Sequence, residues 1–130
     1  MDRTGDWWQQ AAGELAAAQT LLAAGHWAWA CFTGQQAAEK ALKATLEHFR
    51  AGRTGHNLNE LCQALEAHTP VPQNVREACA RLDRHYIPTR SPDAFASGAP
   101  VDQFLEVDAR QALADAEAVM AHVGLLVGSA

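Results

Sequence analysis

The segment that most constrains the fold is residues 27–50, because a helix there has three distinct sides. Placed at about 100° per residue, its side chains form a bulky apolar stripe, a stripe of small residues and a polar stripe. A helix that only builds a core keeps its polar residues toward solvent. We therefore expect a core side, a close-packing side and a polar side that is a candidate binding surface. In that order, the stripes contain Trp27, Cys31, Ala38, Leu42, Leu46 and Phe49; Ala30, Gly34, Ala37, Ala41 and Ala44; and Gln36, Glu39, Lys40, Lys43 and Glu47.

The pattern does not show what satisfies the Gln35 side chain or which helix packs on the small-residue stripe. Gln35 falls inside the bulky stripe, where a buried amide without a hydrogen bond would cost about 1–3 kcal/mol. The small-residue stripe allows another helix to approach closely. That helix belongs either to a partner molecule or to the last helix of the same chain, and the pattern is consistent with both.

Composition limits the chain to one compact helical domain. It has 130 residues, of which 48% are hydrophobic, and this is enough for a single adequate core. Alanine dominates, and no run of β-branched residues reaches the length of a strand. We therefore predict an all-α fold in which residues 1–130 form one domain.

Apolar spacing and capping residues predict an antiparallel helical bundle of about five helices. Gly25 is a typical stop for the first helix. Asn57 and Glu60 have the spacing of a capping box at the start of the third. The predicted helices cover residues 5–24, 27–50, a short segment from 57, 73–86 and 103–127.

A long proline-containing loop is expected near residues 87–102, because Pro88 and Pro92 forbid a regular helix there. Loops longer than about 12 residues in a compact domain are often functional or disordered. The two prolines stiffen this one, so we favour an ordered loop.

Charge and residue spacing argue against several classes of protein. The net charge of −5 is unfavourable for coating nucleic acid through the whole surface, although it allows a local basic patch. No apolar run approaches the roughly 20 residues of a membrane helix, and the N-terminus does not resemble a signal peptide. We therefore expect a soluble cytoplasmic protein that does not bind a membrane.

The cysteines and histidines do not suggest a metal site or any other cofactor. The three cysteines are widely spaced and lack a Cys-x-x-Cys pair, so we interpret them as buried thiols and not as a disulfide frame or a zinc site. The six histidines include no pair at metal-ligand spacing on one helix face.

A basic and aromatic cluster lies where the fourth predicted helix meets the long loop. It contains Arg84, His85, Tyr86 and Arg90. A guanidinium matches the geometry of a phosphate, and a tyrosine can stack on a base or donate a hydrogen bond. A phosphate or nucleotide pocket and a purely structural anchor for the loop both agree with this cluster.

Three other residues have simpler interpretations. For Arg76 and Arg81 we favour a solvated helix surface, with Glu77 and Arg81 paired at i, i+4. His56 lies just before a helix start, so it is a candidate helix cap or a member of a polar site.

Four segments of the chain together form a recognisable pattern. In chain order they are Trp27-Ala28-Trp29-Ala30-Cys31-Phe32, Gln35-Gln36-Ala37-Ala38-Glu39-Lys40-Ala41-Leu42-Lys43, Gly55-His56-Asn57-Leu58 and Tyr86-Ile87-Pro88-Thr89-Arg90-Ser91-Pro92-Asp93. These segments resemble the HEPN domain of bacteria and archaea, and the similarity runs from about Asp6 to Val127. The resemblance implies an all-α bundle that self-associates as a homodimer or higher homo-oligomer. It also implies nucleotide binding, pairing with a minimal nucleotidyltransferase in a toxin–antitoxin type of system and, in many members, metal-independent RNA cleavage.

RNA cleavage in this family depends on an arginine, four to six intervening residues and a histidine near the end of the late helix. The histidine would act on the ribose 2′-hydroxyl or the leaving oxygen, and the arginine would stabilise phosphate charge. No histidine follows Arg81, Arg84 or Arg90 at that spacing. In addition, Ser91 stands where relatives of this type usually have tyrosine.

We therefore expect a non-catalytic HEPN subunit that binds a nucleotide or phosphate, with the polar stripe of residues 27–50 as a second wall of the site. The alternative is a metal-independent ribonuclease toxin with a variant site, whose candidate catalytic residues are Arg81, Arg84 and His85. The expected binding residues are Arg84, Tyr86, Arg90, Asp93, Gln36, Lys40, Lys43 and His56.

Overall fold

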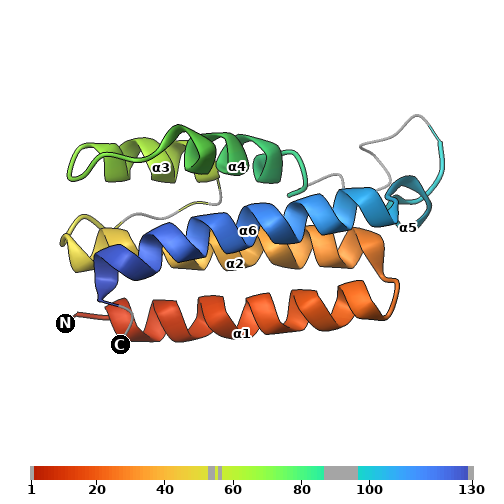
Figure 1. Ribbon diagram of the computed structural model, residues 1–130, viewed down its shortest axis with the longest axis horizontal. Helices are drawn as coiled ribbons and strands as arrows, with labels where there is room; N and C mark the ends of the chain where they lie inside the picture. Colours follow the sequence, from red (N-terminus) through yellow and green to blue (C-terminus); the bar gives the residue numbers. More distant parts are fainter. Residues whose placement is uncertain (1, 53–54, 56, 87–96, 129–130) are drawn as a thin grey trace.

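The computed structural model describes residues 2–52, 55, 57–86 and 97–128, and these residues form six α-helices (Figure 1). They contain no β-strand, so the predicted all-α fold is confirmed. None of the described helices combines the length and the apolar character that a membrane-spanning segment needs. In chain order the helices are α1 (Thr4–Ala23), α2 (Trp27–His48), α3 (Leu58–Glu66), α4 (Gln73–Asp83), α5 (Pro100–Gln103) and α6 (Glu106–Val127).

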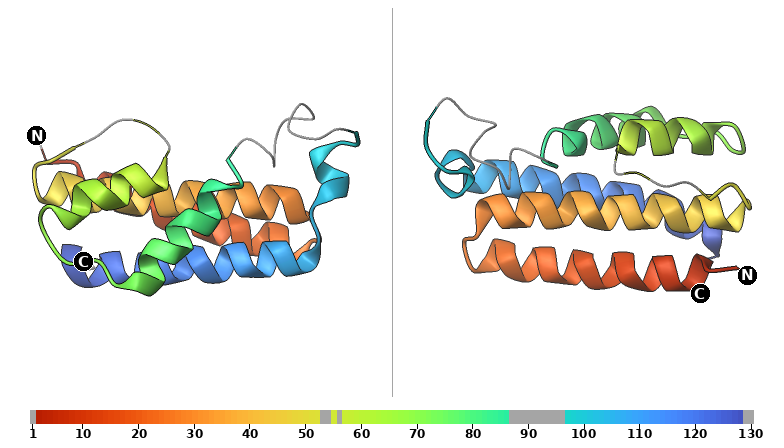
Figure 2. Two further views of the ribbon diagram at one scale, coloured as in Figure 1. Left: turned by 90° about the horizontal axis from the view of Figure 1, so that it is seen from above. Right: turned by 180° about the vertical axis from the view of Figure 1, so that it is seen from behind.

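The long helices are arranged in three layers. The middle layer contains α2 and α6, with α1 on one side and the α3–α4 hairpin on the other (Figures 1 and 2). A turn with Gly25 in the left-handed conformation (φ 84°) makes α1 antiparallel to α2. In contrast, α2 and α6 run in the same direction, which differs from the simple antiparallel bundle that we predicted. The reason is that α4 runs toward the end of the bundle where α2 begins, so that α6 starts at that end as well (Figure 1).

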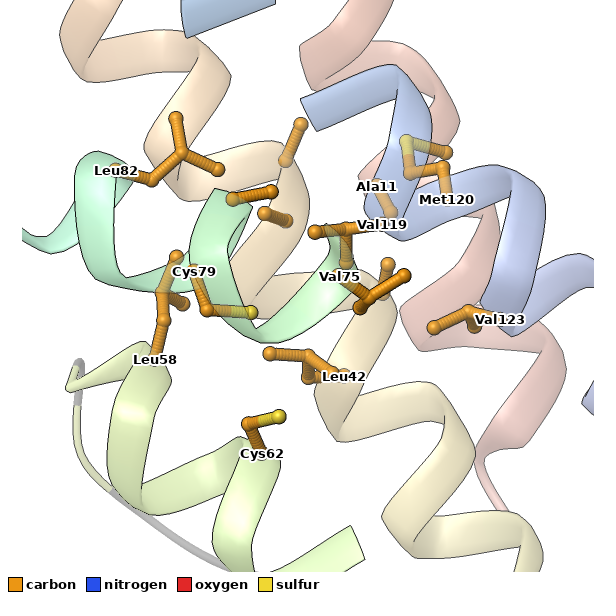
Figure 3. Close-up of a cluster of buried hydrophobic side chains, with 14 of the residues drawn as sticks. Ala11, Leu42, Leu58, Cys62, Val75, Cys79, Leu82, Val119, Met120 and Val123 are labelled. Atoms are coloured by element: carbon orange, nitrogen blue, oxygen red, sulfur yellow. The ribbon is translucent and has the colours of Figure 1, made fainter. Parts of the chain in front are cut away.

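The three stripes of α2 face three different neighbours, and this explains why the helix is almost enclosed. On the small-residue side, Gly34 lies against α6: a Cβ atom placed on it would be 3.5 Å from the carbonyl oxygen of Ala112. On the polar side, the Lys40 ammonium donates a hydrogen bond to Glu14 of α1 at 3.1 Å. The bulky stripe faces the α3–α4 hairpin, where Leu42 is fully buried (Figure 3). The helix that approaches the small-residue stripe therefore belongs to the same chain.

One hydrophobic cluster connects the middle layer to the hairpin. Leu42 of α2 lies among Cys62 of α3 and both Val75 and Cys79 of α4, and Val119 of α6 belongs to the same cluster (Figure 3). None of these five side chains is more than 3% exposed. Full burial of a Leu or Val side chain contributes about 1.5–3 kcal/mol to stability. The cluster therefore holds the α3–α4 hairpin against the middle layer.

The helices differ from the predicted ones mainly at three places. The fourth helix ends at Asp83, a few residues early. Pro100 begins the one-turn helix α5 inside the segment where we expected no regular helix, because the fixed φ of proline suits a first helical position. The last helix begins at Glu106, since Leu105 is extended and its N–H donates to the Asp108 carboxylate at 2.8 Å.

The N-terminus of α3 is held by two side chains, of which the sequence pattern indicated one. Asn57 accepts a hydrogen bond from the N–H of Glu60 at 3.1 Å, as predicted for an N-cap. The Asp83 carboxylate, at the end of α4, accepts from the N–H groups of Leu58 and Asn59 at 2.7 and 2.9 Å. The first N–H groups of a helix have no partner within it, so Asp83 satisfies two of them and joins the two helices of the hairpin.

Candidate functional site

The C-terminal end of α4 leads into the predicted basic and aromatic cluster, and Arg81 lies about one turn before it. Its Nε and Nη2 atoms donate to the two carboxylate oxygens of Asp115 in α6, at 3.0 and 2.9 Å. The Gln111 side chain donates to the same carboxylate at 3.0 Å. Asp115 is buried, and this bidentate contact offsets the loss of its hydration and raises the pKa of Arg81. Arg81 thus joins α4 to α6, where we expected a pair with Glu77 along the helix.

The next two residues differ in exposure. Arg84 is the C-cap of α4, and it is exposed. The half-buried His85 ring packs edge-to-face on the Phe104 ring, with 5.5 Å between centroids. Burial lowers the pKa of His85 and the charge of Arg84 adds to this effect, while Asp108 and Asp115 act in the opposite direction. Arg84 is therefore accessible to a ligand, whereas His85 is biased toward its neutral form.

Three aromatic rings form a row beside this cluster, and two of them were not predicted as site residues. The Tyr86 ring packs on Phe32 with 6.1 Å between centroids, and Phe32 packs edge-to-face on Trp29 with 6.2 Å between centroids. Trp29 is 49% exposed, so part of a large aromatic surface is open to solvent. Residues three apart lie on the same side of a helix. The spacing of Trp29 and Phe32 was therefore the signal for this row in the sequence.

The polar stripe of α2 forms an internal network. Lys43 donates to the Glu39 carboxylate at 3.0 Å, and its ammonium lies 5.4 Å from the centroid of the Trp7 ring in α1. Glu39 is 1% exposed, which is unusual for a carboxylate unless it is paired. The fully buried Gln35 accepts a hydrogen bond from the Gln36 side chain at 2.5 Å. These contacts satisfy polar groups that the sequence placed at or beside the core.

The structure does not bring all the predicted binding residues together. Lys40 and Lys43 contact α1, and α1 lies on the opposite side of the α2–α6 layer from the α3–α4 hairpin (Figure 1). Arg84 and Tyr86 follow α4 on the hairpin side. The α1-facing lysines and the end of α4 are therefore two separate regions of the surface.

Three further predicted residues, His56, Arg90 and Asp93, lie outside the described part of the chain. Within that part, no group of three or more His, Cys, Asp or Glu side chains has the geometry to hold a metal ion. The three cysteines are buried free thiols, as the sequence predicted.

The family of the chain follows from its match to a family model. The model of the HEPN domain matches residues 4–126, which include almost all of the helices described above. The chain belongs to the HEPN domain family. The resemblance seen in four segments of the sequence is thus confirmed for this HEPN domain over nearly its whole length. A search of curated proteins found no match.

Solved structures share the fold of this HEPN domain. TT1696 from Thermus thermophilus has 39% identity and a TM-score of 0.93, with 96% of this chain and 98% of that chain covered. ST0689, an archaeal HEPN homologue, has 31% identity and a TM-score of 0.83, with coverage of 98% and 99%. An HEPN domain protein (tm0613) from Thermotoga maritima has 26% identity and a TM-score of 0.77, with coverage of 96% and 99%.

Proposed function

We propose that this HEPN domain is a non-catalytic subunit that binds a nucleotide or phosphate at the C-terminal end of α4. The observation that carries the proposal is the exposed Arg84 two residues before Tyr86, in a row of rings that ends at the half-exposed Trp29. A guanidinium donates to phosphate oxygens in a fixed planar geometry. Exposed aromatic rings can stack on a base. Arg90 and Asp93, from the adjoining loop, remain predicted members of this site.

The contacts of Arg81 and His85 support a binding role over a catalytic one. The Nε and Nη2 atoms of Arg81 already bind the buried Asp115 carboxylate, so this edge of the guanidinium is not available to stabilise phosphate charge. His85 packs against Phe104, and its lowered pKa disfavours the protonated form that a general acid needs. We therefore assign Arg81 and His85 to the support of the site.

Binding can be tested by the thermal stabilisation that ATP and inorganic phosphate produce. We expect Arg84→Ala to weaken ATP binding by at least about tenfold, since a charge-assisted hydrogen bond contributes about 1.5–3 kcal/mol. Trp29→Ala should weaken binding of ATP but not of phosphate, because only ATP has a base to stack. Arg110→Ala is the matched control: Arg110 is an exposed arginine of α6 that pairs with Glu106 in the next turn. Equal stabilisation of wild type and Arg84→Ala by ATP would reject the site.

The ribonuclease alternative has a direct test. Purified protein incubated with RNA in EDTA should leave the RNA intact. RNA cleavage that disappears in His85→Ala, a variant of a side chain that packs against Phe104, would establish the alternative and reject a non-catalytic role. Circular dichroism of the variant should be recorded in parallel, so that loss of fold is distinguished from loss of a catalytic group.

We also propose that the domain self-associates and pairs with a minimal nucleotidyltransferase. Self-association is supported by three large apolar side chains around α5 and the start of α6, namely Val101, Leu105 and Val107, which are 63–67% exposed. Light scattering should show an oligomer that Val107→Lys dissociates, whereas a monomeric wild type would contradict this part of the proposal. Co-purification from the native cell, analysed by mass spectrometry, tests the nucleotidyltransferase partner.

A further inference from the structure

Two of the three cysteines face each other across the α3–α4 hairpin. Cys62 projects from α3 and Cys79 from α4, and both belong to the cluster around Leu42 (Figure 3). Figure 3 draws both side chains in the space between the two helices, and each thiol influences the pKa of the other, so the two sulfur atoms are neighbours. The pair lies in the interior and contributes to packing, but two adjacent thiols also have a chemistry that a Leu or Val pair lacks.

One thiol of the pair can be reached from the surface. Cys62 lines a surface pocket of about 250 Å³, together with Asn59, Gln63, Glu66 and Arg76. Cys79 is fully buried behind it. The pocket is large enough for a small solute, although only 3% of Cys62 is exposed. A reagent that enters the pocket therefore meets Cys62 first.

The surroundings of the two thiols make them unequal. The neighbouring Cys79 thiol lowers the pKa of Cys62 and the charge of Arg76 acts in the same direction, whereas burial and the Glu66 carboxylate, which accepts a hydrogen bond from the Cys62 thiol at 3.9 Å, act in the opposite direction. The net effect on Cys62 is a lowered pKa, while its neighbour Cys62 and burial raise the pKa of Cys79. Arg76 is held over the pocket by a hydrogen bond to the Val71 carbonyl oxygen at 2.6 Å. Because the thiolate is the reactive form of cysteine, Cys62 has the features of an attacking thiol and Cys79 those of a resolving one.

We propose that Cys62 and Cys79 form a reversible oxidation site, in which hydrogen peroxide converts the two thiols into a disulfide between α3 and α4. The Cys62 thiolate attacks one peroxide oxygen, the O–O bond breaks and hydroxide leaves, which gives a sulfenic acid on Cys62. The Cys79 thiolate then attacks the Cys62 sulfur, and the S–O bond breaks as a second hydroxide leaves. The two thiol protons and the two hydroxides make two water molecules, so two sulfurs are oxidised and one peroxide is reduced.

The disulfide would fasten the two helices of the hairpin at a second point. Asp83 already joins α4 to the start of α3, and the new bond would lie more than a turn earlier on α4. A cross-link between two helices stabilises a domain mainly by restricting its unfolded chain. Oxidation should therefore raise Tm, and a thiol reductant should reverse the rise. The site does not depend on nucleotide binding, because neither thiol belongs to the cluster at the end of α4.

The experiment is a peptide map of the full chain after exposure to hydrogen peroxide. Free thiols are blocked with N-ethylmaleimide and the protein is digested with trypsin, which cleaves after Arg53, Arg76 and Arg81. Cys62 and Cys79 then fall on separate peptides, 54–76 and 77–81, and Cys31 on a third. We expect the first two peptides to be joined, with two hydrogens lost, and to separate after dithiothreitol treatment.

Cys31 and a variant supply the controls. Cys31 is fully buried in α2, and burial raises its pKa to about 12, so its peptide should carry no added oxygen and no link to another peptide. In Cys79→Ala, peroxide should produce a sulfenic acid on Cys62 that dimedone traps, and no linked peptide. The map of the wild type decides the question even where this variant folds poorly. Separate peptides after peroxide treatment, or oxidation of Cys31 before Cys62, would overturn the proposal.

Discussion

The Arg81 guanidinium and the Asp115 carboxylate join the end of α4 to the middle of α6 through two parallel hydrogen bonds of 3.0 and 2.9 Å. The carboxylate is 5% exposed and the guanidinium 41% exposed. Solvent therefore reaches the arginine side of the pair, whereas the aspartate side is buried in the protein. Its position fixes the turn that carries Arg84 and Tyr86, so the geometry of the candidate site depends on a contact 34 residues apart in the chain.

Arg81→Ala should destabilise the domain, because it leaves the buried Asp115 carboxylate without its cation. The loss should exceed that of a fully exposed ion pair because Asp115 is buried, although solvent screens the exposed side of Arg81. The free energy of unfolding, measured in urea, would give this difference. Arg110→Ala is the matched control, since its exposed pair with Glu106 should contribute less than about 1 kcal/mol. Equal values for the two variants would contradict a structural role for the Arg81 pair.

The Gly34 position should tolerate alanine but not a larger side chain. A Cβ atom at this position would lie 3.5 Å from the Ala112 carbonyl oxygen and 3.9 Å from the Ala116 Cβ atom, which is ordinary van der Waals contact. Gly34→Ala should therefore stabilise the helix by up to about 1 kcal/mol through its higher helix propensity. Gly34→Leu should cost about 1–3 kcal/mol or more, because it overpacks the α2–α6 contact. Urea unfolding of both variants tests this, and a stable Gly34→Leu protein would contradict the close approach.

The helical character of the chain could be predicted because it depends on local properties. Alanine content, the spacing of apolar residues and the Asn57 cap all act within a few residues of each other. The small-residue stripe of α2 also predicted the side on which another helix approaches closely. In the structure Gly34 of this stripe lies against α6. The parallel direction of α2 and α6 could not be predicted. It depends on the path of the chain between them, which no short-range pattern encodes.

Less of the candidate site than of the fold could be predicted from the sequence. The meeting of a helix end with the long loop singled out Arg84 and Tyr86 in the sequence, but the sequence could not show that the Lys40 ammonium binds Glu14 of α1. It also could not show that the Phe32 ring packs between the rings of Tyr86 and Trp29. Such contacts join helices that are distant in sequence, and many partners are compatible with one charged or aromatic residue.

Asp83→Asn should weaken the attachment of α3 to α4. The carboxylate accepts from the N–H groups of Leu58 and Asn59, and its charge interacts favourably with the helix N-terminus. An asparagine keeps one acceptor oxygen but loses the second and the charge, so we expect a cost of about 1–2 kcal/mol. Asp102→Asn, at an exposed position of α5, is the control for the loss of a carboxylate. Hydrogen exchange should show faster opening of α3 in Asp83→Asn only, and unchanged protection would argue against this contact.

Acidification should destabilise the domain through His85, whose pKa is held below its ordinary value mainly by burial. The unfolded chain binds this proton near pH 6.5, whereas the folded chain binds it only at lower pH. Between these two values the unfolded state carries more protons, so the free energy of unfolding falls as the pH drops below about 6.5. Once His85 is protonated in the folded state as well, its titration no longer lowers the free energy of unfolding. His122, whose pKa is also lowered by burial, contributes in the same sense.

The measurement is urea unfolding of wild type and His85→Gln at pH 8.5, 7.5 and 5.5. Wild type should lose stability between pH 7.5 and 5.5, and His85→Gln should lose less, because glutamine does not titrate. The difference between the two proteins should stay constant between pH 8.5 and 7.5, where the imidazole is neutral in both the folded and unfolded states. A loss of stability on acidification that is equal in the two proteins would show that the burial of His85 beside Phe104 does not contribute to it.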